Sequence, residues 1–319
     1  MFRLISVYFL VLILVACNSQ SKDEKEIEKI SLDLKVTRFD KEFAQVTAAN
    51  LAQLKGEYPY LFPERFTDSM WIAKANDTIQ QELNIEVEKA FPDFSSEEDG
   101  IYDLFQHAKY YFPSFKVPQV ITITSDVDYR NKVLLTPDFL FISLDTYLGS
   151  EHPFYMGIQT YLKKNFEKDQ ILPDIANEIA EVYVPQPDSK TFLAHMLYYG
   201  KILYLKDRLL SNVADHNKIG YSVEELDWAI ANEEEVWRYF VEREVIFNTD
   251  SDLYSRFLYP APFSKFYLEL DAESPARLGQ FIGWQMIRQY MDKNEVSIQE
   301  MLAANAETIF NKANYKPKK

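Results

Sequence analysis

Apolar residues follow two different spacings along this chain, and the spacing changes near Pro153. Before that point, residues 117–124 and 139–144 are rich in β-branched and aromatic residues and are the best strand candidates. Residues 30–36 alternate apolar and polar side chains, as a first strand would. Residues 126–131 are typical of a turn between strands. A small sheet is therefore expected in the first half of the chain.

Helical spacing accounts for most of what remains. It predicts helices over residues 41–55, 69–83, 102–111, 174–185, 189–210, 228–243, 276–291 and 298–310. The order, mixed α and β first and mainly helices after, predicts a predominantly helical α+β fold. No composition shift divides residues 30–319, so a single domain is expected there.

Local signals mark two helix starts and one helix contact. Residues 222–225 and 297–300 each have the Ser-x-x-Glu spacing of a capping box, in which two orphan backbone donors are satisfied reciprocally. Gly279 and Gly283 lie one turn apart in the predicted helix 276–291. We expect this glycine face to permit close packing of another helix rather than to contact a ligand.

The amino terminus has the features of an export signal. Arg3 precedes a mainly apolar run over residues 4–16, which is too short to span a bilayer as a helix. Leu14-Val15-Ala16-Cys17 matches the pattern read by lipoprotein signal peptidase. The sequence thus predicts a signal peptide over 1–16 and a lipid on Cys17; the alternative is an ordinary signal peptide with a coincidental cysteine.

A polar segment follows the predicted lipid site. Residues 17–29 have no apolar period and are interpreted as a lipidated, flexible linker. Within it, Lys22-Asp23-Glu24 resembles the Lys-acidic-acidic signals that send some lipoproteins to the cell surface, but the match is short and off the usual position, which favours a plain solvated linker. Two or three acyl chains would anchor the protein stably to a membrane of the cell envelope.

Composition excludes several classes of function. Cys17 is the one cysteine, so once lipidated it leaves no thiol for a disulfide or a thiolate nucleophile. The net charge of −15 makes nucleic acid a poor partner, since such binding needs Lys and Arg to neutralise phosphates. We find no GxSxG, Walker, GxGxxG or HExxH motif, and the four histidines are scattered. No cofactor and no histidine-rich metal site are expected.

One stretch resembles a metal motif without its metal. In the active-site helix of a zincin, histidines at i and i+4 hold zinc and a glutamate at i+1 activates water. Here Asn177 and Glu181 occupy the histidine positions, Glu178 occupies the glutamate position, and Tyr199 stands where a third ligand would follow. An amide, a carboxylate and a phenol are a poor zinc set. The pattern predicts a degenerate zincin-like scaffold; the simpler interpretation is an acidic helix with Glu178 and Glu181 facing solvent.

The second half of the chain resembles the GldB-type gliding-motility lipoproteins of Bacteroidetes. The strings that carry the resemblance are 192–205 (FLAHMLYYGKILYL), 218–222 (KIGYS), Asn232-Glu233 with Trp237, 261–269 (APFSKFYLE), 273–279 (ESPARLG), 282–285 (IGWQ) and 314–317 (NYKP). The resemblance implies a membrane-anchored component of the gliding machinery, in bacteria whose motility shares parts with the type IX secretion system. It implies protein partners from that apparatus and no established reaction.

Three functions remain open from the sequence. We favour a lipid-anchored, non-enzymatic accessory protein of the gliding and secretion apparatus. The second hypothesis is a hydrolase that uses Glu178 or Glu181 as a base. The third is a carbohydrate-binding lipoprotein that uses the aromatic residues, 15% of the chain, clustered at 58–66, 110–115 and 257–267. The alternative for those rings is that they fill the interior.

Overall fold

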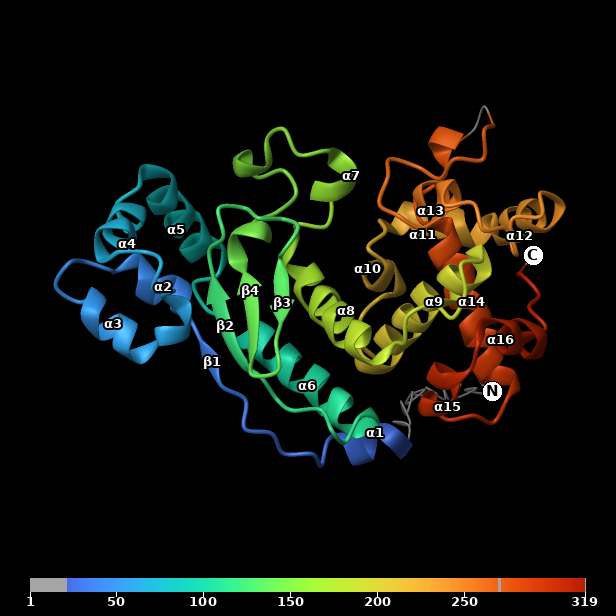
Figure 1. The fold of residues 1–319 in the computed structure, drawn as a ribbon, viewed down its shortest axis with the longest axis horizontal. Coiled ribbons are helices and arrows are strands. Elements are labelled where there is room, and N and C mark those ends of the chain that lie inside the picture. The colour runs from blue at the N-terminus through green and yellow to red at the C-terminus, as the bar shows by residue number, and fades with distance from the viewer. Residues whose placement is uncertain (1–21, 269–270, 319) are drawn as a thin grey trace, which may run out of the picture.

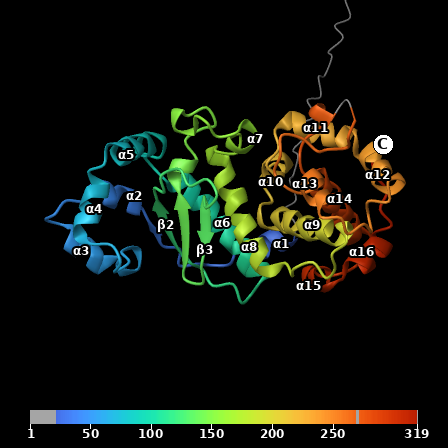
Figure 2. The same cartoon turned by 45° about the horizontal axis from the view of Figure 1, so that its top comes forward.

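The computed structural model describes residues 22–268 and 271–318. Cys17 and the predicted signal peptide lie outside the described residues. Helices α2–α5 form one end of the molecule, the sheet with α6 and α8 lies in the middle, and the C-terminal helices form the other end (Figures 1 and 2). The fold is a predominantly helical α+β fold with a small sheet, as the sequence predicts.

The four-stranded sheet has the order β1-β2-β4-β3. Its strands are β1 (Val36–Thr37), β2 (Gln119–Ile123), β3 (Val133–Leu135) and β4 (Phe139–Ser143). Strands β1, β2 and β4 are parallel, whereas β3 pairs with β4 in antiparallel register and forms one edge of the sheet. The two central strands were predicted from sequence, but β3 was not, because three residues are too few to establish a period.

Both faces of the sheet are covered. Val120, Leu140 and Ile142 point into the large hydrophobic core with α6 (Ser95–Tyr111) and α8 (Ile171–Tyr183). On the opposite face, Ile121 and Phe141 pack in a smaller core with the N-terminal helices. Alternate residues of β2 and β4 therefore contribute to different cores, as the period of two in a strand requires.

The first strand is shorter than predicted. Residues 30–35 are not part of the sheet, and only two residues pair with β2. Two backbone groups of this segment bond to side chains of α6: the N–H of Leu32 donates to the Tyr102 hydroxyl at 3.1 Å, and Gln106 donates to the carbonyl of Ile30 at 2.6 Å. Burial alternates along the segment as in a strand, but the contact with β2 begins only at the carbonyl of Lys35, which accepts from the N–H of Val120.

The predicted turn before β3 is held by a buried carboxylate. Asp126 and Val127 both have left-handed backbones, with φ of 57° and 58°. Asp145, fully buried, accepts hydrogen bonds from the backbone N–H groups of Ser125 and Val127. Burial raises the pKa of Asp145, while these backbone bonds oppose the rise.

The N-terminal helices are α2 (Phe39–Ala44), α3 (Leu51–Glu57), α4 (Asp68–Ala75) and α5 (Thr78–Ala90). The single helix predicted over 41–55 is thus two. Asn50 explains the break: its side chain accepts from the N–H of Thr47 and donates to the carbonyl of Gln45, which gives the backbone an alternative to helical bonds.

The helices after Pro153 are α7 (Thr160–Lys163), α8, α9 (Phe192–Leu209), α10 (Asp215–Ile219), α11 (Val223–Ala231), α12 (Glu233–Glu242), α13 (Asp252–Phe257), α14 (Leu278–Lys293), α15 (Ile298–Ala303) and α16 (Ala306–Ala313). Both predicted capping boxes are present, at Ser222 and Ser297. Two predicted helices are each divided by an asparagine. Asn232 ends α11 and precedes α12, and Asn305 caps α16.

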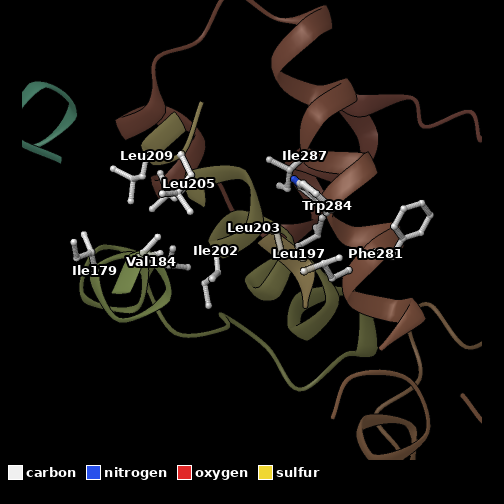
Figure 3. Close-up of a cluster of buried hydrophobic side chains, with 14 of the residues drawn as sticks. Ile179, Val184, Leu197, Ile202, Leu203, Leu205, Leu209, Phe281, Trp284 and Ile287 are labelled. Atoms are coloured by element: carbon white, nitrogen blue, oxygen red, sulfur yellow. The ribbon is translucent and has the colours of Figure 1, made fainter. Parts of the chain in front are cut away.

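Helix α9 lies at the centre of the helical part, between α8 and α14. Leu197, Ile202 and Leu203 of α9 face Phe281 and its neighbours on α14 and the buried side chains of α8 (Figure 3). Gly200 of α9 meets the backbone of α14 at Gly283, and a Cβ on either residue would overlap the other helix. The prediction that the α14 glycines permit close helix packing is confirmed.

The segment predicted as a flexible linker contains a helix, α1 (Lys22–Ile27). Ile27 is only 1% exposed, and Glu24 lies 3.3 Å from Nε2 of the buried His107 on α6. Asp23 accepts a hydrogen bond from the Tyr110 hydroxyl at 3.2 Å. The prediction of flexibility is therefore wrong for these six residues, because one apolar side chain and two acids have partners on α6.

Candidate functional site

Helix α8 carries three of the four residues that the zincin-like pattern singles out. Buried Ile175 and Ile179 hold one face of the helix in the core. On the other side, the Asn177 amide donates from Nδ2 to Oε1 of Glu181 at 2.7 Å. The two side chains at the zincin histidine positions thus satisfy one another.

Glu178 has a different environment from Glu181. Glu181 is exposed, as the simpler interpretation expects, but Glu178 is only partly exposed. Burial, followed by the charge of Glu181, raises the pKa of Glu178 to about 7. The backbone N–H of Leu135, on edge strand β3, opposes this rise. A carboxyl group that titrates near neutrality therefore lies between α8 and the sheet edge.

Tyr199, on α9, completes the set. Asn177, Glu181 and Tyr199 line one cavity of about 210 Å³, which is bounded by α8, α9, α10 and the start of α14. Burial raises the pKa of Tyr199 to about 12, so its hydroxyl stays neutral. The structure brings these three residues together, whereas Glu178 is not among the residues that line the cavity.

The donor set does not fit a zinc ion. Zinc sites in proteins use thiolate, imidazole and carboxylate ligands, and here they would be replaced by an amide already bonded to the one carboxylate and by a neutral phenol. Within residues 22–268 and 271–318, no three His, Cys, Asp or Glu side chains are grouped as metal ligands would be. We derive no step through a metal.

The same cavity is lined by three cations that sequence reasoning missed. Lys206 of α9 is 6% exposed, and its Nζ donates to the carbonyl of Lys218 at 3.0 Å. Lys218 and Arg277 also line the cavity. No clear signal for Lys206 was present in the sequence, because it ends the apolar stretch 202–205 and is followed by Asp207 and Arg208, as an exposed lysine would be.

Lys218 is neutralised by a buried ionic network. It lies 3.2 Å from Asp207 and 3.3 Å from Asp215. Arg288 of α14 forms a two-bond pair with Asp207, each bond 2.7 Å long, and Trp284 Nε1 donates to the same carboxylate at 2.8 Å. The charges of the two carboxylates and the two cations cancel in this network. Because its members come from α9, α10 and α14, the network holds these three helices together.

Of the thirteen aromatic residues in the three aromatic-rich segments, five are buried, five are partly buried and three are exposed. Phe62, Phe112, Phe115, Phe257 and Phe266 are all buried. The tyrosines that remain exposed are Tyr60, Tyr259 and Tyr267, and they come from segments at opposite ends of the molecule. No common aromatic face for a sugar ring follows from them.

Comparison with known proteins places the chain. The family model described as gliding motility protein GldB matches residues 20–317. The chain belongs to the GldB family. The resemblance inferred from the sequence is thereby confirmed, and with it an association with gliding motility and the cell envelope. The match begins after Cys17, so the predicted lipid site lies outside it.

No curated protein and no solved structure matched the chain. In the described part of the molecule, every helix is too short or too polar to cross a membrane.

Proposed function

We propose that this GldB-family protein is a lipid-anchored, non-catalytic accessory component of the gliding machinery, working with type IX secretion. Membership of the family supports the motility role. The lipoprotein pattern at Cys17 supports the anchor. The observation that carries the non-catalytic role is the hydrogen bond between Asn177 and Glu181, because it engages the two side chains that stand at the metal-ligand positions of the zincin pattern.

The arrangement of β3, β4, α8 and α9 supports a degenerate zincin-like scaffold. An antiparallel edge strand lies against the helix that carries Asn177, Glu178 and Glu181, and Tyr199 follows on the next long helix. A fold that retains this layout without its ligands can present the cleft as a binding surface. We propose that the protein binds components of the gliding or secretion apparatus rather than turning over a substrate.

Crosslinking in gliding cells, followed by affinity purification of the full-length protein, tests this role. We expect a motility or secretion component to be recovered with it. A matched strain with Cys17→Ser controls for contacts that need the membrane. Repeated recovery of no such component from the wild-type strain would contradict the proposal.

One observation favours a second candidate, a hydrolase. A carboxyl group with a pKa of about 7, as in Glu178, is suited to exchange protons at neutral pH. Glu178→Gln separates the two functions because it retains the size of the side chain and removes its proton chemistry. The accessory role predicts normal gliding in this variant. Loss of gliding with normal protein level and an unchanged circular dichroism spectrum would favour the hydrolase.

A further inference from the structure

The cavity beside Asn177, Glu181 and Tyr199 contains more positive charge than the acidic chain around it would suggest. Lys206 and Arg277 both line it. Within the part of the chain that the structure describes, neither forms an ion pair with a carboxylate: the Nζ of Lys206 donates to the carbonyl of Lys218, and Nη2 of Arg277 donates to the carbonyl of Gly220 at 2.8 Å. The contacts of these two cations are therefore with neutral groups: backbone carbonyls for both, and the Tyr221 ring for Arg277.

Nearby acids are engaged elsewhere or lie at the entrance. Asp174 pairs with Lys132 and accepts from the Tyr147 hydroxyl. Glu181 is exposed and accepts from Asn177, so it lies at the solvent side of the cavity. Among the residues that line the cavity, apart from Lys218 with its two acids, two cations therefore stand against one carboxylate, and one positive charge has no counterion within the lining. Because a charge buried without a partner is costly, the cavity favours a singly charged anion.

The remaining residues that line the cavity favour a ligand with an apolar side group. Ile202, Leu203, Ile219 and Leu258 contribute apolar walls. The volume of about 210 Å³ corresponds to roughly seven water molecules at ~30 Å³ each. This is below the range of drug-sized pockets, so only a small ligand fits. Tyr259 also lines the cavity, and because it is exposed it lies near the entrance together with Glu181.

The backbone conformation of Arg277 fixes the position of one of the two cations. Arg277 has φ of 60°, an uncommon conformation for a residue with a side chain, and it immediately precedes α14. Its guanidinium lies over the Tyr221 ring, 5.4 Å from the centroid. The 16-residue helix α14 thus starts at the cavity, and its N-terminal dipole adds to the positive potential there.

We propose that this cavity binds a small organic carboxylate with an apolar side group, with Lys206 and Arg277 as its counterions. The negative charge of Glu181 at the entrance disfavours a dianion such as phosphate. A free amino-acid derivative and the carboxyl terminus of a peptide share the chemistry required. This binding site is independent of whether the protein has an accessory or a hydrolytic role.

Isothermal titration of the detergent-solubilised full-length protein tests the proposal, with N-acetyl-L-leucine, N-acetyl-L-leucinamide and inorganic phosphate as probes. We expect the carboxylate to bind at least tenfold more tightly than the amide and than phosphate. A leucine-terminated tripeptide with a free carboxyl group, compared with its amidated form, distinguishes a peptide terminus from a free acid. Equal binding of carboxylate and amide, or binding of neither, would overturn the proposal.

Two variants locate the site. Lys206→Met should weaken N-acetyl-L-leucine binding at least tenfold. Lys201→Met is the matched control: Lys201 is also a buried lysine of α9, but its Nζ donates to the carbonyls of Leu302 and Ala304, away from the cavity. If Lys206→Met does not fold, Arg277→Gln carries the same test. Unchanged affinity in a folded Lys206→Met or Arg277→Gln protein would exclude the site.

Discussion

Gly200 of α9 and Gly283 of α14 lie against one another, so that the two helix backbones touch with no side chain between them. A methyl group at Gly283 would overlap the carbonyl of Met196. Because backbone cannot move aside as a side chain can, we expect Gly283→Ala to lower the free energy of unfolding by about 2–3 kcal/mol, at the upper end of overpacking costs. Urea unfolding followed by circular dichroism measures the change.

Gly56 provides the control for that substitution. It lies within α3, and a Cβ added there would meet nothing within 4 Å. Gly56→Ala should therefore raise stability by about 0.5–1 kcal/mol, since alanine has the higher helix propensity. If Gly283→Ala did not lower the free energy of unfolding relative to Gly56→Ala, the backbones of α9 and α14 could not lie in direct contact at Gly283.

The carboxylate of Asp207 joins three elements. It accepts from Trp284 and Arg288 of α14 and pairs with Lys218 of α10. Removing its charge leaves buried Lys218 and partly buried Arg288 with one acid fewer, so Asp207→Asn should cost about 3 kcal/mol of unfolding free energy, the lower end of the cost of breaking a buried pair. The shift of the urea midpoint measures this. Asp33→Asn, whose carboxylate is 88% exposed, should change stability by less than about 0.5 kcal/mol.

Glu178 should make stability depend on pH. Its pKa rises from 4.5 to about 7 on folding, chiefly through burial, so the folded state binds the extra proton between these values. The contribution is fully present below pH 4.5 and is lost as pH rises through 7. Because the carboxyl keeps some contact with water, we expect Glu178→Gln to be more stable than wild type at pH 8 by about 1–2 kcal/mol.

Thermal unfolding at pH 5 and pH 8 measures this difference. The variant and the wild type should converge at the lower pH. Glu82→Gln, on the exposed side of α5, should leave the pH profile as it is. If wild type and Glu178→Gln showed the same change in stability between pH 5 and pH 8, the assignment would be contradicted.

Loss of the predicted lipid site should change where the protein is found. Cys17→Ser removes the only sulfur to which the lipid could be attached. We expect the variant to leave the membrane fraction and gliding to stop, because the remaining chain has no other predicted anchor. Fractionation with immunoblotting and a gliding assay test the two parts. Normal gliding by a protein released from the membrane would show that the anchor is dispensable.

Sequence patterns predicted the parts of the fold that depend on local chemistry. The central strands β2 and β4 and the capping boxes at Ser222 and Ser297 all depend on residues close to one another in the chain. The contacts at the break in the predicted helix 298–310 depend in part on a distant residue. Asn305 caps α16 locally, but the carbonyls of Leu302 and Ala304 at the end of α15 accept hydrogen bonds from Lys201 of α9.

The candidate site shows the same limit. The spacing of Asn177 and Glu181 on one helix was sufficient to place them together. The contribution of Arg277 was not visible, because its role follows from a left-handed backbone and from the packing of α14 against α9. The flexibility expected of residues 22–27 was also wrong, since nothing nearby in the sequence reveals their partners on α6.

The docking of α1 sets the length of any tether. Only four residues separate Cys17 from Lys22, so a fully extended chain between them reaches about 18 Å. A body of roughly 300 residues has a radius of gyration of about 19 Å. A lipid on Cys17 would therefore keep α1 within about 18 Å of the bilayer, whereas α7, at the opposite side in Figure 1, could lie farther out. A partner of the α1 side would then have to bind within this narrow distance of the membrane.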